Sequence, residues 1–172
     1  QIQMEYASGD AALKLLLEEL HHIREMILRV TRQIRELSRS DRYREDVKNL
    51  ITIPGISTLT AMVILTELVD INRFKRPDDL RSYVGLIPGE HSSGDKKVIT
   101  DITMRHNSML RWVLIESAWV AVRKDPALAM SFNKLSSRMP KNKAIIRIAR
   151  KLLNRIRYVL KNKKAYQINV VE

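Results

Sequence analysis

The residues best suited to chemistry lie in one short stretch, from Tyr83 to Lys97. Its three glycines and one proline break a helix, so we expect an irregular loop. A serine hydroxyl beside a glycine can be approached closely by a substrate, and Lys96 and Lys97 favour an anionic one. We therefore hypothesise that Ser93 is a nucleophile for a DNA phosphodiester. The alternative is a solvated surface loop.

A serine nucleophile needs a base or a metal to remove its proton and a positive site for the developing charge. Lys96, Lys97, Arg105 and Arg111 meet the second need, because Arg105 and Arg111 fall near a predicted helix start, where phosphate is favoured. No residue meets the first, and the acids offer no convincing magnesium site. We expect no cofactor in this chain and no cleavage by it alone.

The charge of the chain is segregated. The 172 residues carry a net charge of +12, and residues 101–172 hold sixteen bases against four acids. Such a basic surface indicates a polyanion partner, against the alternative of a merely soluble basic face. The bases recur every three or four residues along a predicted helix at about 142–164, and like charges at this spacing destabilise a helix unless a polyanion offsets them. The expected phosphate ligands on this helix are Lys143, Arg147, Arg150, Arg157, Lys161 and Lys164.

The elements that must position these residues read as helices, so the expected fold is all-α. Apolar residues repeat at spacings of 3 and 4 from Leu13 to Leu37, after a predicted N-cap at Asp10. This pattern predicts a coiled-coil oligomerisation helix over residues 1–40, although packing within its own domain is the alternative. Residues 41–172 are expected to form a helical domain, with the nucleophile loop at about 85–103.

A helix-hairpin-helix motif is expected at about 42–69. A helix should stop at Pro54-Gly55, and Ser57 should cap the next one. In such motifs the tight turn lets backbone N–H groups meet a DNA phosphate, so Gly55 and Ser57 are candidate contacts; a plain helical corner is the alternative. The motif positions a duplex without reading its bases.

Further helix starts are expected at Pro77, at Asn107 or Ser108, and at Asp125-Pro126. Trp112 and Trp119 fall seven residues apart, which is more typical of core than of a base-stacking surface. The tail after Lys164 should be frayed.

The ordered set of motifs resembles the C-terminal half of insertion-sequence transposases of the IS one-ten type, which are DEDD recombinases guided by a structured RNA. The resemblance runs from about Asp10 to Tyr166. One local departure is His106, where the family usually has glycine. The motifs that carry the resemblance are Ile53-Pro54-Gly55-Ile56, Arg73-Phe74, Tyr83-Val84-Gly85-Leu86-Ile87-Pro88, Ser92-Ser93-Gly94 and Asn107-Ser108-Met109-Leu110-Arg111.

The resemblance implies a function in DNA transposition and recombination. It implies that the serine before the loop glycine, here Ser93, attacks DNA and forms a phosphoserine link. It also implies DNA and guide-RNA partners, a bacterial or archaeal cytoplasm, and Mg²⁺ held by four acids of an N-terminal domain that this chain lacks. No stretch is long and apolar enough for a membrane span. Two other classes stay open: a non-catalytic helix-hairpin-helix DNA-binding module, and a coiled-coil assembly protein.

Overall fold

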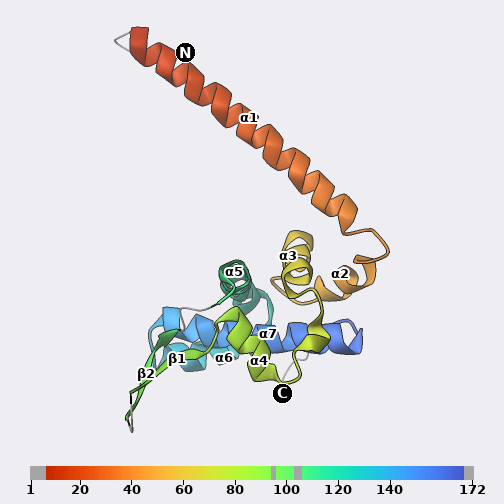
Figure 1. Ribbon diagram of the computed structural model, residues 1–172, viewed down its shortest axis with the longest axis vertical. Coiled ribbons are helices and arrows are strands. Elements are labelled where there is room, and N and C mark those ends of the chain that lie inside the picture. The colour runs from red at the N-terminus through yellow and green to blue at the C-terminus, as the bar shows by residue number, and fades with distance from the viewer. Residues whose placement is uncertain (1–6, 94–95, 103–105, 169–172) are drawn as a thin grey trace.

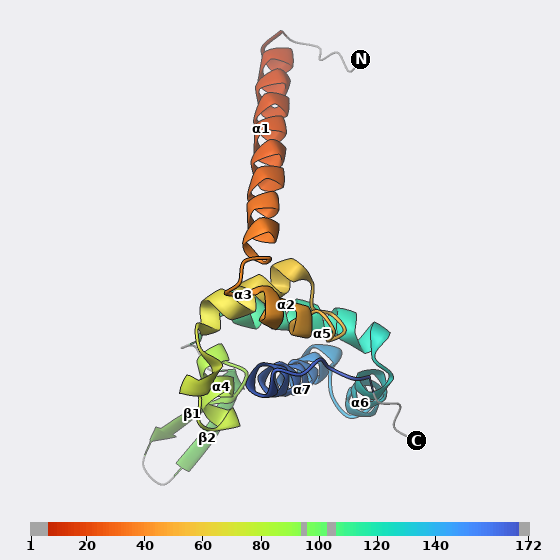
Figure 2. The ribbon, with the colours of Figure 1, turned by 90° about the vertical axis from the view of Figure 1, so that its right-hand side faces the viewer.

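The computed structural model describes residues 7–93, 96–102 and 106–168, with the backbone alone at residues 7 and 88–102. A long helix leads into a compact body of shorter helices, from which one β-hairpin projects (Figures 1 and 2). The helical class expected from the sequence is confirmed apart from this hairpin. In chain order the elements are α1 (Ala7–Leu37), α2 (Arg44–Leu50), α3 (Thr58–Leu68), the 3-10 turn η1 (Ile71–Arg73), α4 (Pro77–Val84), β1 (Pro88–Ser93), β2 (Lys96–Ile102), α5 (Ser108–Lys124), α6 (Pro126–Ser136) and α7 (Lys141–Asn162).

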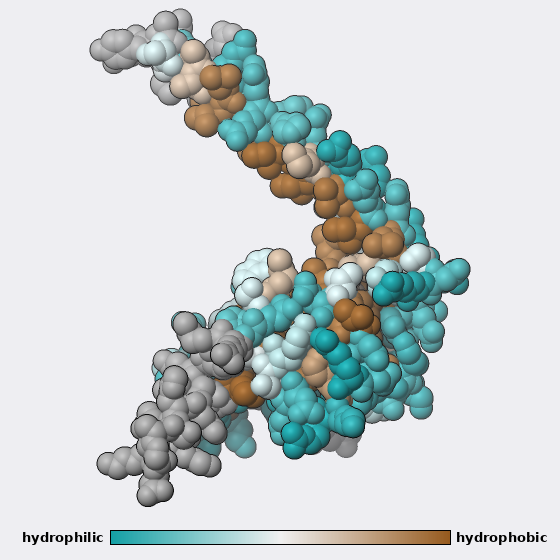
Figure 3. All heavy atoms as spheres, viewed as in Figure 1, coloured by the Kyte–Doolittle hydropathy of each residue, from teal (hydrophilic) through white to brown (hydrophobic). Residues whose placement is uncertain are grey.

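Helix α1 extends away from the body and keeps its apolar stripe exposed. Ile34, near its C-terminal end, packs against the core, whereas side chains farther out such as Leu16 and Ile27 remain exposed. Figure 3 shows hydrophobic surface along the side of α1 that faces the body. The helix is already formed at Ala7, so Asp10 lies in its first turn and is not the N-cap that we predicted.

Helices α2 and α3 flank the Gly55 turn, and α2 ends at Leu50, before the Pro54-Gly55 position where we expected a helix to stop. Ser57 caps α3 by accepting a hydrogen bond from the Thr60 N–H at 3.1 Å. Gly55 has a φ of +92°, and a Cβ there would lie 2.3 Å from the carbonyl oxygen of Ser117 on α5. The structure therefore gives Gly55 a packing role between the turn and α5.

Helix α4 and its exit are as predicted. Pro77 occupies the first turn of the helix, and Gly85 ends it with a left-handed φ of +77°. The Gly85 N–H donates to the Ser82 carbonyl at 3.0 Å, and the Leu86 N–H donates to the Arg81 carbonyl at 2.9 Å. These bonds turn the chain sharply toward the hairpin.

The segment that we expected to be irregular forms an antiparallel hairpin instead. In the register of β1 and β2, His91 pairs with Val98 and Ser93 with Lys96, and the register shifts between Pro88 and Gly89. The β-branched run from Val98 to Thr100 favours an extended strand. Pairing with β1 then satisfies backbone N–H and C=O groups that an irregular loop would leave hydrogen-bonded to water.

Helices α5, α6 and α7 pack against each other, and with α2, α3 and α4 they enclose the core. Asn107 caps α5 by accepting from the Leu110 N–H at 2.9 Å, as predicted. The apolar stripe of α7, which includes Ile145, Leu152 and Ile156, is fully buried. The core is filled mainly by branched aliphatic side chains, among them Leu50, Ile53, Ile64, Leu68, Leu80, Leu86, Leu110, Leu114, Leu128, Ile148, Leu152 and Leu153.

Candidate nucleic-acid interface

The candidate nucleophile lies at the far end of the first hairpin strand. Ser93 is the last residue of β1, and its backbone pairs with that of Lys96 at the start of β2. Lys97 pairs with Ser92 in the same ladder. The two predicted phosphate ligands and the predicted nucleophile therefore lie on adjacent paired strands, on a hairpin that stands away from the helices (Figure 2).

The two ends of the hairpin meet the body at one place, which we call the hairpin root (Gly85, Leu86, His106 and Asn107). The Asn107 N–H donates to the Tyr83 carbonyl at 3.0 Å, which joins the start of α5 to the end of α4. A Cβ on Gly85 would lie 2.2 Å from the Cβ of His106. The departure at His106 therefore leaves the turn intact, because the glycine on the opposite side supplies the space.

Polar side chains tie the hairpin root to α3. The amide nitrogen of Asn107 donates to Glu67 Oε2 at 2.6 Å, and the Tyr83 hydroxyl donates to the Glu67 carbonyl at 3.1 Å. Asn107 thus caps α5 with its oxygen and holds Glu67 with its nitrogen. Arg111, one turn into α5, lies 3.0 Å from His106 Nε2, and burial lowers the pKa of its guanidinium. Arg105 lies outside the described residues.

An aromatic cluster supports the same root from η1 and α4. The ring centroids of Phe74 and Tyr83 are 5.3 Å apart, and the Arg73 guanidinium lies 4.6 Å from each of them. A cation over aromatic faces and a tilted ring pair are both favourable. The adjacent residues Arg73 and Phe74 therefore have a structural role in positioning α4.

The predicted basic stripe of α7 is divided by the fold. Three of its members donate hydrogen bonds to backbone carbonyls of the segment from Phe74 to Leu86, which precedes the hairpin. Arg150 donates to Leu86, Arg157 donates to Lys75 at 3.0 Å, and Lys161 donates to Phe74 at 3.3 Å. We predicted that all of these basic side chains bind phosphate, whereas these three form hydrogen bonds within the protein.

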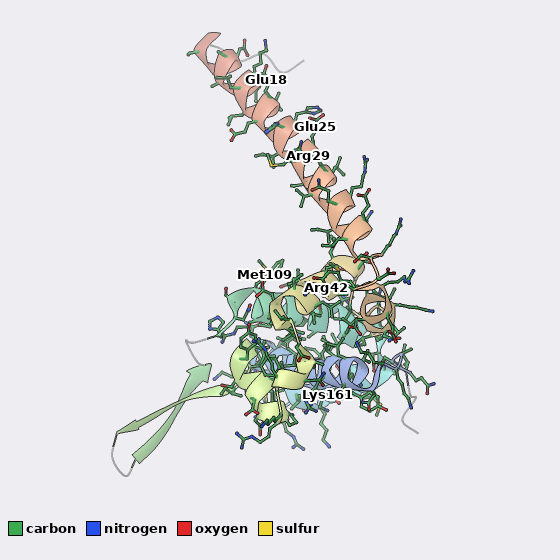
Figure 4. The ribbon with its side chains drawn as sticks, turned by 45° about the vertical axis from the view of Figure 1, so that its right-hand side comes forward. Glu18, Glu25, Arg29, Arg42, Met109 and Lys161 are labelled. Carbon is green, nitrogen blue, oxygen red and sulfur yellow. The ribbon has the colours of Figure 1, made fainter. Side chains whose placement is uncertain are left out.

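The remaining members of the stripe are placed on the surface. Lys143, Arg147 and Lys164 are exposed, and Lys143 also has an interaction within the protein. Lys161, which donates to Phe74, is also exposed and lies on the side of the body away from α1 (Figure 4). An exposed basic face therefore persists on α7, although a narrower one than predicted.

A shallow groove lies beside the Gly55 turn. It has a volume of about 520 Å³ and is bordered by Ser57, Thr60 and Trp112. The Ser57 hydroxyl is already bonded to the Thr60 backbone within the cap. Trp112 is 62% exposed here, which contradicts the expectation that it is core, whereas Trp119 packs edge-on against Phe132.

A buried ionic cluster escaped the sequence analysis. Asp125, with its side chain fully buried, caps α6, pairs with Arg155 at 2.5 Å and accepts a hydrogen bond from the Tyr166 hydroxyl at 3.0 Å. The Tyr166 N–H also donates to the Thr52 hydroxyl at 2.7 Å, so the predicted fraying of the tail is wrong at this residue. Only the cap signal of Asp125-Pro126 was readable from the sequence.

Metal binding and membrane insertion find no support among the described residues. No group of three or more histidine, aspartate or glutamate side chains there could hold a metal ion. None of the helices in the described ranges combines the length and the apolar character that crossing a bilayer requires.

Comparison with known proteins gives the family. Residues 47–133 match the model for "Transposase IS116/IS110/IS902 family", and this match covers half of the chain. The chain belongs to this transposase family. The match confirms the resemblance to the IS one-ten type. It spans α2 to α6, and it therefore includes the Gly55 turn, the hairpin and both sides of the hairpin root.

Curated members of the transposase family show the same relationship. The chain is 34% identical over 120 residues to the transposase for insertion sequence element IS1111A of Coxiella burnetii, covering 67% of this chain and 33% of that protein. It is 31% identical over 113 residues to the transposase for IS1328 of Yersinia enterocolitica, covering 63% and 33%. A probable family 20 transposase of Pseudomonas aeruginosa is 28% identical over 143 residues, covering 81% and 41%. The chain thus spans about a third of the length of these relatives.

Proposed function

We propose that this chain is the DNA-binding C-terminal part of a transposase, and that Ser93 is its phosphodiester nucleophile. The observation that supports this most is the placement of Ser93 at the end of β1, paired with Lys96, on a hairpin within the region that matches the transposase family. Attack would join Ser93 Oγ to phosphorus while a deoxyribose oxygen leaves and takes up a proton. The phosphoserine link would conserve the ester for rejoining.

Contacts at the hairpin root would fix the position of β1 and β2 relative to the helical body. Arg150 donates to Leu86 on one side, and Asn107 is fixed by Tyr83 and Glu67 on the other. Pre-organised supports of this kind improve the positioning of a reacting group. Duplex contacts would come from Lys96, Lys97 and the exposed bases Lys143, Arg147 and Lys164, with the Gly55 turn as a further phosphate contact.

Activation of the serine is proposed to come from elsewhere. The two acids of α4 are engaged with other partners: Asp78 pairs with Arg81 at 2.7 Å, and Asp79 pairs with Arg76 at 3.1 Å. These exposed ion pairs form no oxygen-rich cage of the kind Mg²⁺ prefers. We propose that an acidic domain of the full-length protein supplies Mg²⁺, in a bacterial or archaeal cytoplasm.

The remaining proposed partners are a structured guide RNA and a second copy of the chain. The exposed apolar stripe of α1, which includes Leu16, Leu20, Ile23 and Ile27, is the surface for self-association, because a coiled-coil partner would bury it. The charge of the last 72 residues suits RNA as well as DNA.

Substitution of Ser93 in the full-length transposase tests the nucleophile. Ser93→Ala should abolish the covalent protein–DNA adduct on a denaturing gel and abolish strand exchange, while DNA affinity by fluorescence anisotropy stays within about twofold, since one exposed hydroxyl adds little binding energy. Ser92→Ala, the matched control next door, should retain both activities. An adduct that persists in Ser93→Ala and disappears in Ser92→Ala would reassign the nucleophile.

A further inference from the structure

A trough runs along α7 on its α6 side. Helices α6 and α7 pack side by side (Figure 2). Two adjoining hollows of about 610 and 800 Å³ meet at Asn154 and Arg155, and together they extend from Lys134 on α6 to Gln167 in the C-terminal segment. We call the joined hollows the α6–α7 trough.

The lining of the α6–α7 trough is basic. Lys134, Lys151, Arg155 and Lys164 border it, and none of its lining residues is acidic. Arg155 forms an ion pair with the buried Asp125, so its charge is neutralised within the protein and stabilises the packing of α7 against α6. The three lysines are exposed, and the Lys151 ammonium also donates to the Ser131 hydroxyl at 2.8 Å, so all three place positive charge at the trough.

Two large side chains add apolar surface between these lysines. Tyr158 is 58% exposed and borders the trough at its C-terminal half, and Met130 is 63% exposed at the other half. Both lie outside the core cluster, so burial does not explain them. Unpaired nucleobases stack on exposed aromatic rings of this kind, while the phosphates contact neighbouring lysine and arginine side chains.

We propose that the α6–α7 trough binds a single-stranded segment of nucleic acid, with one base stacked on Tyr158 and flanking phosphates beside Lys151 and Lys164. A duplex keeps its bases stacked on each other and has no free face to offer a tyrosine, whereas a loop or an unpaired end does. The inference rests on the proposed function only in taking nucleic acid as the partner. It adds a surface that is separate from Ser93 and shares only Lys164 with the proposed duplex contacts.

The test measures binding of the 172-residue chain to a fluorescein-labelled twelve-nucleotide thymidine strand and to a twelve-base-pair duplex. Tyr158→Leu should weaken single-strand binding by about tenfold, the loss expected for one stacked base, and change duplex affinity by less than twofold. Tyr158→Phe, which keeps the ring, should bind the single strand as the wild type does. Lys151→Ala should lower the slope of log K against log salt by about one, and Lys14→Ala on α1 should not change it.

The outcomes separate this inference from the proposed function. If the wild type binds duplex but Tyr158→Leu binds the single strand unchanged, the trough assignment is wrong and the proposed function is unaffected. A loss of duplex and single-strand affinity by the same factor would also overturn it, because the trough would then be a duplex surface. If the wild type binds neither probe in a salt-dependent manner, both proposals fail. Equal weakening by Tyr158→Leu and Tyr158→Phe would point to the hydroxyl and overturn the stacking role.

Discussion

Arg150 donates a hydrogen bond from its Nε to the carbonyl oxygen of Leu86, which lies 64 positions earlier in the chain. Leu86 is fully buried and immediately precedes the turn into β1. Burial lowers the pKa of the Arg150 guanidinium, and the neighbouring charges of Arg147 and Arg81 add to this effect. A helix that appears from its sequence to be a phosphate-binding surface is thus also a support for the segment that carries the candidate nucleophile.

Replacing Arg150 or Arg147 with methionine should separate the two roles of α7. Arg150→Met should lower the free energy of unfolding by about 1–3 kcal/mol, because the buried Leu86 carbonyl loses its partner. Amide hydrogen exchange should accelerate at the hairpin root. Arg147→Met removes the same charge from an exposed position, so stability should change by less than about 0.5 kcal/mol while the salt slope of DNA binding falls by about one. Equal effects on stability would contradict the assignment.

Gly55→Ala should destabilise the fold by at least about 2 kcal/mol, measured by urea denaturation. The added Cβ would meet the backbone oxygen of Ser117, and φ at this position is left-handed, so neither side can relax at low cost. Gly9→Ala makes the same chemical change within α1, where alanine is the better helix former, and should be neutral or slightly stabilising. A neutral Gly55→Ala would show that the turn and α5 are not packed as described.

Tyr166→Phe should cost about 1 kcal/mol at neutral pH, because Asp125 loses a hydrogen bond. Burial first, and then the bond to Asp125, raises the pKa of Tyr166 above the ordinary tyrosine value of 10.0. The unfolded chain therefore loses this proton at a lower pH than the folded one. The contribution of Tyr166 to stability is complete below pH 10 and declines as the pH rises through the folded pKa. The difference in unfolding free energy between wild type and Tyr166→Phe, followed by chemical denaturation, should shrink over this range; a constant difference would contradict the burial of the hydroxyl.

Aspartate at two stripe positions of α1 should produce a monomer. Ile23→Asp with Ile27→Asp places two charges on the apolar side of the helix, where a partner helix would have to desolvate them. Sedimentation equilibrium should show a larger species for the wild type and a single chain for the double variant. Glu18→Gln with Glu25→Gln, on exposed positions of the same helix (Figure 4), serves as a control whose charge change has the same size and the opposite sign. A wild type that is monomeric at micromolar concentration would contradict self-association.

Local signals predicted most of the helices because each depends on residues close together in the chain. Ser57, Pro77, Asn107 and Asp125 act at helix starts as their types indicate. The extended run near Val98 was also readable, but its pairing with β1 was not, since the glycines before it indicated a turn. Cross-strand pairing depends on a partner that no single segment specifies.

The site was harder to predict, because its key contacts join distant segments. The spacing of the bases on α7 is the same whether they contact phosphate or donate to the carbonyls of Phe74, Lys75 and Leu86. Asp125 and Tyr166 are 41 residues apart, and nothing in either local sequence indicates the other. Gly55 was predicted as a candidate phosphate contact, whereas the atom that demands a glycine at this position belongs to α5. Such reasons appear only once the helices have packed.

The uninterrupted course of α1 sets a length scale for the molecule. The helix has thirty-one residues and no glycine or proline beyond the first turn, so it is rigid and about 46 Å long. Whatever is joined to its outer end is held at that span from the helical body. Excising seven residues would draw the two ends closer by about 10 Å with little rotation, whereas excising five would swing the outer end roughly halfway around the axis. Reach and angular phase are therefore separately adjustable in this helix.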